Sequence, residues 1–262
     1  MKLITGANSL IGEALAKSFT ASQEPFALIN GFDFSNITHF SPSTVEAIIC
    51  LSNRDWFAVS ETDFSGKDFF EFNLKLWDYA ATHAIKYIAV FDKTYFLSKF
   101  LSANYATPKT IEAYANYLEK FQDWIRIRSQ KPFLWYGIQT NVVYDLASLF
   151  QWFESEKMQI HTQNRQVKID WIHVEDVVKL IVWFLHHDKP SGFYSLTGSF
   201  RRTLEETLET LQTQKRLFNK PEIQWVKEVY SYPDFSQNDY DMKLLRTSGY
   251  HKRLKSFVEG IK

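Results

Sequence analysis

The segment Thr5–Gly12 (TGANSLIG) has the residue types and spacing of a turn that could hold a phosphate. It follows an apolar run and precedes apolar residues at helical spacing, which predicts a strand-to-helix junction. Such a junction directs backbone N–H groups and the positive end of a helix at an anion. Gly6 would form the turn, and Gly12 would let the helix pack closely on the strand. At the middle position of this motif, where the backbone must approach the phosphates, the residue is Ser9 instead of glycine.

This turn stands at the first junction of a chain that alternates strands and helices, which favours a dinucleotide site over an ordinary turn. The Ser9 side chain adds a hydroxyl that would either crowd a phosphate or donate to it. The residues of the turn that we expect to contact the cofactor are Gly6, Asn8, Ser9, Leu10, Ile11 and Gly12.

The end of the second predicted strand should hold the ribose of such a cofactor. An acidic residue often stands there, about 20 residues after the turn, but in this chain the position is Asn30. An asparagine can bond a ribose hydroxyl but does not repel a 2′-phosphate as a carboxylate would, so NAD and NADP both remain candidate cofactors. Asp33 is the nearest carboxylate, and a cap or turn is its alternative role.

Other polar groups give weaker signals. The side chains of His186–His187 would diverge on a helix and no carboxylate is spaced to complete a site, so we expect a solvated helix end and no metal. Arg201–Arg202 could meet a diphosphate, although a solvated loop pair is favoured, and His173 is expected to make a structural hydrogen bond. The single cysteine, Cys50, excludes an internal disulfide and a thiolate zinc cluster.

The order of apolar runs and amphipathic segments indicates how these residues are positioned. Strands alternating with helices imply a parallel sheet covered on both faces, with its ligand crevice at the carboxyl ends of the strands. The predicted fold class is α/β, a Rossmann-type doubly wound parallel sheet with a small C-terminal substrate lobe. The expected strands are Lys2–Thr5, Phe26–Ile29, Val45–Leu51, Tyr87–Phe91, Phe133–Ile138 and Gly192–Leu196, and the expected helices are Glu13–Phe19, Lys67–Ala84, Thr107–Arg126, Leu146–Phe153, Val174–Leu185 and Tyr240–Thr247.

The second half of the chain is less regular than the first. We divide the chain into residues 1–145, a dinucleotide-binding core, and residues 146–262, a mixed segment that returns to the core and forms the reduced substrate lobe. In the second part, Thr203 and Glu206 have the spacing of a capping box that opens a helix. Gly249 follows the last expected helix at a position that suits a left-handed C-cap.

Composition limits the classes of function. The 30 basic and 30 acidic side chains cancel, whereas a nucleic-acid binder usually needs a basic field. The N-terminus does not have the pattern of a signal peptide, and the apolar runs are far shorter than the roughly 20 residues that cross a bilayer. We therefore expect a cytoplasmic protein with no nucleic-acid or membrane partner. The unusual figure is the aromatic content of 17%, against only nine glycines.

Several segments share an order with one family along nearly the whole chain. They resemble the extended short-chain dehydrogenase/reductases, the NAD-dependent epimerases and dehydratases that act on nucleotide sugars. The tail FSQNDYDMKLLRTSGYHKRLKSFVEGI is most similar to the branch that epimerises nucleotide-linked heptoses. The segments that carry the resemblance are TGANSLIG, DFSN with Asp33, VEAIICLSN, FFEFNLKLW with Asn73, DWIHVEDVVKLIVWFL with His173, Val174 and Asp176, and GFYSLTGS.

The resemblance implies a protein that binds NAD or NADP and acts on a nucleotide-linked sugar as an oxidoreductase or epimerase. A homo-oligomer is one expected form. The resemblance also extends the set of expected cofactor-binding residues, which already includes Asn30, by Asp33, Leu51, Ser52, Asn73 and Lys109.

The resemblance further implies that Tyr105 and Lys109, in YATPK, are the catalytic pair. In the family's chemistry, a tyrosine exchanges a proton with a sugar oxygen while hydride moves to or from nicotinamide, and the lysine lowers the phenol pKa. A spacing of four residues places both side chains on one helix face. Tyr95 and Lys99 have the same spacing, but we prefer the first pair because it opens the long helix expected before the Phe133 strand.

Departures from the family pattern favour an alternative, a catalytically silent relative that uses the nucleotide pocket for binding, regulation or assembly. Ser9 replaces the middle glycine, and Phe91 stands where the family has a hydroxyl, which leaves Thr94 as the nearest candidate. Gln139 replaces an arginine, and the segment that carries a second acid/base lysine is missing after Tyr144.

Overall fold

The computed structural model describes the chain in segments. Asn30, Asp33 and Ser52 lie outside the described residues, as do the three predicted catalytic residues, Thr94, Tyr105 and Lys109. The described residues are 1–29, 34–51, 67–92, 120–121, 123–128, 133–153, 157–161, 168–198, 201–213, 222–226 and 242–260.

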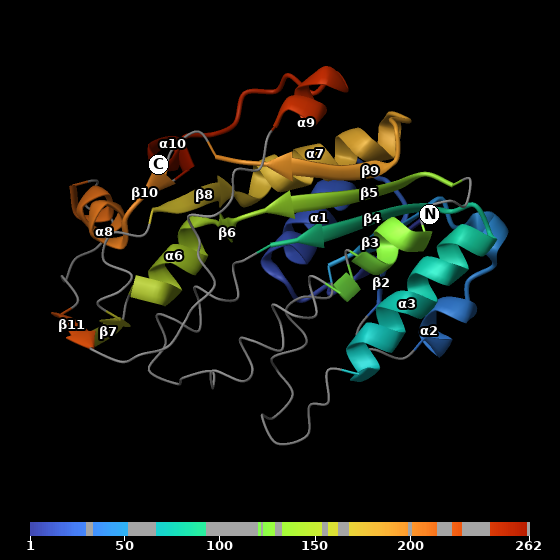
Figure 1. Ribbon diagram of the computed structural model, residues 1–262, viewed down its shortest axis with the longest axis horizontal. Helices are drawn as coiled ribbons and strands as arrows, with labels where there is room; N and C mark the ends of the chain where they lie inside the picture. Colours follow the sequence, from blue (N-terminus) through green and yellow to red (C-terminus); the bar gives the residue numbers. More distant parts are fainter. Residues whose placement is uncertain are drawn as a thin grey trace.

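A six-stranded parallel sheet forms the centre of the described structure (Figure 1). Every residue of the central strands β1 and β3 is buried, as expected for strands covered on both faces. The predicted doubly wound α/β fold is confirmed. In spatial order, the strands are β2 (Phe26–Ile29), β1 (Lys2–Thr5), β3 (Ala47–Cys50), β4 (Lys86–Phe91), β5 (Trp135–Thr140) and β9 (Gly192–Leu196).

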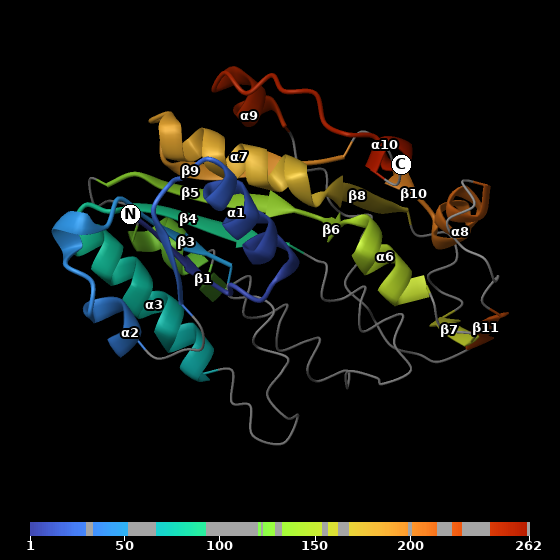
Figure 2. The same ribbon diagram turned by 180° about the vertical axis from the view of Figure 1, so that it is seen from behind.

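Helices cover both faces of this sheet. The helices α1 (Leu10–Ala21) and α7 (Val174–His186) lie side by side on one face, and α3 (Lys67–Thr82) lies on the other (Figures 1 and 2). Alternate strand residues divide accordingly, so that Ile4 packs toward α1 and α7 while Leu3 packs toward α3. The short helices α2 (Ser35–Thr38) and η1 (Pro42–Thr44) connect β2 to β3.

Much of the aromatic surplus lies on the α3 face. Trp77 of α3 is fully buried, and its ring lies edge-on to those of Tyr87, Phe133 and Trp135 at centroid distances of 5.2, 4.9 and 5.5 Å. Trp124, in the described helical residues 123–128, lies 6.0 Å away on the same cluster. Edge-on ring pairs add packing energy beyond the area they bury. The described aromatic side chains of α3 therefore belong to the core.

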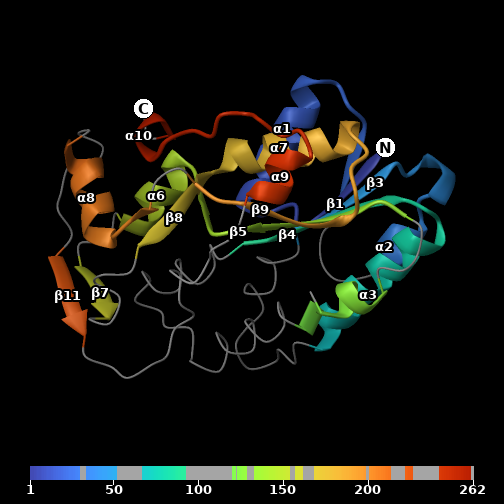
Figure 3. The same cartoon turned by 45° about the horizontal axis from the view of Figure 1, so that its top comes forward.

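The remaining described elements lie largely beyond the carboxyl ends of β4 and β5, apart from α9 (Lys243–Thr247), which packs on β9 (Figure 3). Among the described residues, no helix is both long and apolar enough to cross a bilayer. These elements are a three-stranded sheet of β10 (Arg201–Arg202), β8 (Ile169–His173) and β6 (Val142–Tyr144), a pair of strands β11 (Glu222–Val226) and β7 (Lys157–His161), and the helices α6 (Leu146–Phe153), α8 (Leu204–Thr213) and α10 (Phe257–Gly260).

Both predicted helix boundaries in the second half are confirmed. The Thr203 amide donates to Glu206 Oε2 at 2.8 Å, and the Glu206 amide donates to Thr203 Oγ1 at 3.1 Å, which is a reciprocal capping box. Gly249 follows α9 with φ +100°, a left-handed conformation that favours glycine.

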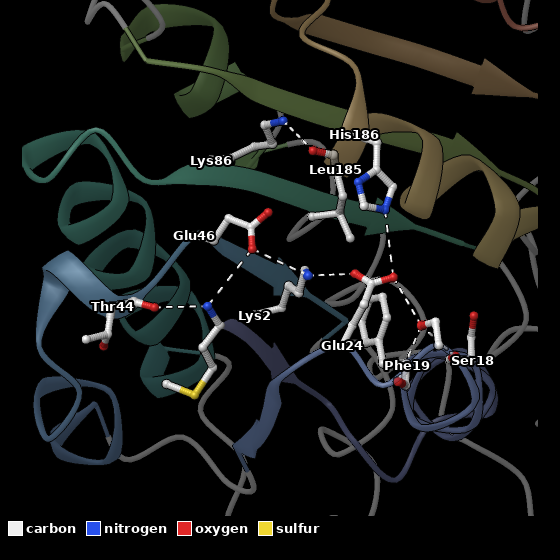
Figure 4. A network of polar contacts seen from close by, with 11 residues as sticks. Lys2, Ser18, Phe19, Glu24, Thr44, Glu46, Lys86, Leu185 and His186 are labelled. Atoms are coloured by element: carbon white, nitrogen blue, oxygen red, sulfur yellow. Dashed lines mark hydrogen bonds and ion pairs between the residues drawn. The ribbon is translucent and has the colours of Figure 1, made fainter.

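Lysine side chains at the amino ends of two parallel strands form ion pairs and hydrogen bonds with neighbouring elements. Lys2 is 4% exposed, and its ammonium lies 2.6 Å from Glu24 and 3.4 Å from Glu46 (Figure 4). Lys86 donates from Nζ to the carbonyls of Phe184 and Leu185 at 3.0 and 2.8 Å, which caps the C-terminal end of α7. Side chains from β1 and β4 thereby bind the turn after α1 and the end of α7.

We expect Glu24→Gln to lower the free energy of unfolding at neutral pH by about 1–2 kcal/mol, because Lys2 would stay buried with a weaker partner. Burial raises the pKa of Glu24, but hydrogen bonds from Lys2 and Ser22 outweigh it and hold the pKa below its ordinary 4.5. The ion pair therefore stabilises the fold above pH 4.5 and is lost as the pH falls through the lowered pKa.

Urea denaturation of both proteins at pH 7 and pH 3 measures this effect, and the difference should shrink in acid. Glu209→Gln, on the exposed face of α8, is the matched control and should change stability by less than about 0.5 kcal/mol. A difference that stays constant between the two pH values would contradict the role of the Glu24 charge.

Candidate dinucleotide site

The crevice expected in a doubly wound sheet lies where the strand order reverses. Here the chain moves outward from β1 to β2 on one side, and continues through β3 on the other side of β1. Ligands bind such folds at the carboxyl ends of the strands beside this switch point. Thr5 and Cys50 are neighbours in register at these ends, and the Leu51 amide donates to the Thr5 carbonyl at 3.2 Å. The glycine turn and Leu51 are therefore adjacent.

The glycine turn has the predicted backbone. Gly6 has φ +70°, in the left-handed region, and its carbonyl accepts the Ser9 amide at 3.0 Å. A Cβ at Gly12 would lie 2.7 Å from the Gly6 oxygen and 2.6 Å from the Ala7 oxygen, which is too close for any side chain. Gly12 thus permits a close approach as expected, but the atoms it approaches belong to the turn and not to the strand.

Ser9 has a role that the two sequence-based alternatives did not include. It is the N-cap of α1, with extended backbone, and its Oγ accepts the Gly12 amide at 3.0 Å. The side chain is turned toward the helix and is 8% exposed. Serine is among the residues that cap helices best, because its hydroxyl supplies an acceptor for the first turn that glycine does not have.

Two amides remain available at the N-terminus of α1. Gly12 donates to Ser9 Oγ, and Glu13 donates to the Ser9 carbonyl at 2.9 Å. Leu10 and Ile11, the first two helical residues, have no intrahelical acceptor, and their amides meet none elsewhere in the described part of the chain. Together with the positive end of the helix dipole, these donors form a place for a phosphate group.

Asn73 contacts the carboxyl end of β3. It lies in α3, is fully buried, and its Oδ1 accepts the Cys50 thiol at 2.9 Å. This contact ties the middle of α3 to the carboxyl end of β3, one residue before Leu51. Asn8, in contrast, is exposed on the turn.

Phe91 occupies the end of β4, where a hydroxyl was expected. Its ring is 6% exposed and packs against Phe121 and Phe193 at centroid distances of 5.8 and 6.0 Å. The position therefore contributes to the core on the α3 face. Asp145, which follows Tyr144, caps α6 by accepting the Ser148 amide at 2.7 Å.

Sequence reasoning missed two hydroxyls at the carboxyl edge. Thr5 and Thr140 are the last residues of β1 and β5, and each is 1% exposed. Their Oγ1 atoms have no hydrogen-bond partner among the described residues. The available signal was a threonine at the end of one predicted strand and another two residues beyond the end of a second, next to a predicted crevice.

Most of the histidines and arginines that gave weak sequence signals make structural contacts. His173 is the N-cap of α7, where its Nδ1 accepts the Glu175 amide at 3.3 Å, and burial lowers its pKa. Arg202 donates to Thr210 at 2.7 Å and Arg201 is exposed on β10. His186 lies on the end of α7, 3.8 Å from Glu24. Within the described residues, no three His, Cys, Asp or Glu side chains gather as a metal site would require.

Comparison with known proteins agrees with the observed fold. No family model matches the chain. ADP-L-glycero-D-manno-heptose-6-epimerase of Fusobacterium nucleatum is 24% identical over 252 residues, which cover 83% of this chain and 75% of that protein. This similarity confirms the resemblance to the heptose epimerases that the sequence indicates.

Solved structures show the same fold. A dTDP-4-dehydrorhamnose reductase from Bacillus anthracis, in complex with NADP, has a TM-score of 0.69 and 13% identity, covering 99% of this chain and 95% of its own. A UDP-glucose 4-epimerase from Thermus thermophilus, in complex with NAD, has a TM-score of 0.65 and 14% identity, covering 100% and 96%. In sequence the chain is therefore similar to ADP-L-glycero-D-manno-heptose-6-epimerase, and in fold it is similar to nucleotide-sugar epimerases and reductases solved with NAD or NADP.

Proposed function

We propose that this protein binds NAD or NADP at the carboxyl ends of β1 and β3 and acts on a nucleotide-linked sugar as an oxidoreductase or epimerase. The observation that carries the proposal is the Gly6–Gly12 turn, which presents the N-terminus of α1 beside the switch point of the sheet. The sugar class follows from the relatives, which are an epimerase of an ADP-linked heptose, a reductase of a dTDP-linked sugar and an epimerase of UDP-glucose.

The residues present fit such a cofactor. The absence of a Cβ at Gly12 keeps the turn folded onto the helix, and the Leu10 and Ile11 amides are two donors for a pyrophosphate. Leu51 borders the same crevice from β3, and Asn30, Asp33 and Ser52 complete the proposed set from the sequence. A bound nicotinamide would supply the acceptor or donor of hydride.

In the proposed reaction, Tyr105 exchanges a proton with the sugar oxygen and Lys109 lowers the phenol pKa electrostatically. Both residues come from the sequence pattern YATPK, and Lys109 would also contact the cofactor ribose. Thr94 is the hydroxyl nearest in sequence to the end of β4. We further propose a cytoplasmic location, a homo-oligomer, and the division of the chain at residue 145 into a cofactor core and a substrate lobe.

The alternative function is binding without turnover, and Phe91 favours it. A buried ring packed against Phe121 and Phe193 offers no hydrogen bond to a substrate at the end of β4. Under this alternative, the dinucleotide crevice serves regulation or assembly. The two functions share the cofactor site and differ in the fate of the substrate.

We expect Leu10→Pro to weaken dinucleotide binding by about 10- to 100-fold, because it removes one amide that would donate to a charged phosphate. Proline suits this first helical position, and Ser9 before it already has the extended backbone (φ −80°, ψ 158°) that proline requires of its neighbour. Calorimetric titration with NAD, NADH, NADP and NADPH measures the effect.

Leu10→Ala is the matched control, because it shortens the same side chain but keeps the amide. Its affinity should stay within about threefold of the unmodified protein, while both variants keep their circular dichroism. Equal affinities for the proline and alanine variants would count against the amide contact. Failure of the unmodified protein to bind any of the four dinucleotides would remove the cofactor proposal.

We expect Tyr105→Phe to reduce turnover by at least about 100-fold while dinucleotide affinity stays nearly unchanged, because the ring remains and only the exchangeable proton is lost. The assay follows the absorbance of reduced nicotinamide and the epimeric composition of ADP-, dTDP- and UDP-linked sugars. Tyr95→Phe, in the second Tyr-x-x-x-Lys pattern, is the control and should keep full turnover. A protein that binds the dinucleotide and turns over none of these sugars would support the silent alternative.

A further inference from the structure

Asp170 is a buried carboxylate that the proposed function does not use. It lies in β8 and is 2% exposed. Its Oδ1 accepts the backbone amide of Gly198 at 2.8 Å, whereas its Oδ2 is buried with no hydrogen-bond partner in the described part of the chain. A carboxylate held in this way loses most of its hydration and recovers only part of it from the protein.

The segment that Asp170 contacts, Thr197–Gly198, packs closely on β8. Gly198 lies two residues after the end of β9, and a Cβ there would lie 2.5 Å from Asp170 Oδ1 and 2.6 Å from the Trp171 carbonyl oxygen. The approach therefore requires glycine. Leu196, the last residue of β9, pairs in register with Thr140 at the carboxyl end of β5. The Thr197–Gly198 segment therefore borders the carboxyl edge of the sheet, where the crevice is expected.

Arg201 is the charged group that acts on Asp170, and it is directly opposite in the antiparallel pair of β10 and β8. Burial raises the pKa of Asp170 to about 6, against the lowering effects of the Gly198 hydrogen bond and the Arg201 charge. The other charged or titratable groups of the elements packed on β8 interact elsewhere: Arg202 with Thr210, Glu175 with Lys255, Asp176 with the Lys255 amide and Lys179, Glu259 with Arg253, and Tyr144 and His173 with each other.

We propose that Asp170 is a proton-dependent tether that holds the Thr197–Gly198 segment against β8. The inference goes beyond the proposed function and does not depend on it, since it concerns a contact within the chain. When the segment lifts, the carboxyl regains water and its pKa returns toward the ordinary 3.8. The state in which the segment packs on β8 therefore binds the proton more tightly. The tether is strongest below about pH 4 and weakens as the pH rises through about 6.

Hydrogen exchange of the Gly198 amide, followed by NMR and corrected for the intrinsic effect of pH, tests the tether. From the two pKa values, protection of this amide should fall by about tenfold between pH 5 and pH 8. In Asp170→Asn, which keeps an oxygen acceptor but cannot titrate, protection should be independent of pH. In Arg201→Gln, the fall should move to higher pH, because Arg201 lowers the pKa.

The Thr207 amide, which donates to the Thr203 carbonyl at 3.0 Å, is the internal control and should keep constant protection. Three results would overturn the proposal. The first is the same pH dependence in Asp170→Asn, and the second is no pH dependence in the unmodified protein. The third is a parallel fall in protection at Thr207, which would mean that the whole fold, and not the segment, responds to the proton.

Discussion

The path of the chain from β1 into α1 depends on the absence of a side chain at Gly12. The carbonyl oxygens of Gly6 and Ala7 occupy the space that a Cβ would need, at 2.7 and 2.6 Å. This contact holds the first turn of α1 over the end of β1, so that the amides of Leu10 and Ile11 face the switch point of the sheet. The proposed cofactor site depends on that steric constraint, and the cap from Ser9 stabilises the same turn.

The two ends of the sheet have different physical roles. At the amino ends, Lys2 and Lys86 bring charge partners and helix carbonyls together, and these contacts hold the layers in place. At the carboxyl ends, the buried hydroxyls of Thr5 and Thr140 have no partner among the described residues. A buried hydroxyl without a partner lowers stability unless a ligand or a water molecule supplies the missing hydrogen bond. Stability and proposed function are thus separated along the strand direction.

The aromatic residues explain why fold and activity must be judged separately. Trp77 and its neighbours make the α3 face of the core, and Phe91 continues that packing to the end of β4. The same ring that completes the core puts an apolar side chain, and not a hydroxyl, at the last residue of β4. A fold can persist while its chemistry changes, since packing needs only shape and apolar area whereas catalysis needs particular groups at particular atoms.

Sequence alone determined the features that depend on neighbours along the chain. Periodicity located β2, β9 and α6 at their observed bounds, and spacing identified the Thr203–Glu206 capping box. Only the tertiary structure decided which distant groups meet. The carbonyls beside Gly12, the rings around Phe91 and the Gly198 amide on Asp170 come together through packing between elements, and no local pattern encodes such contacts.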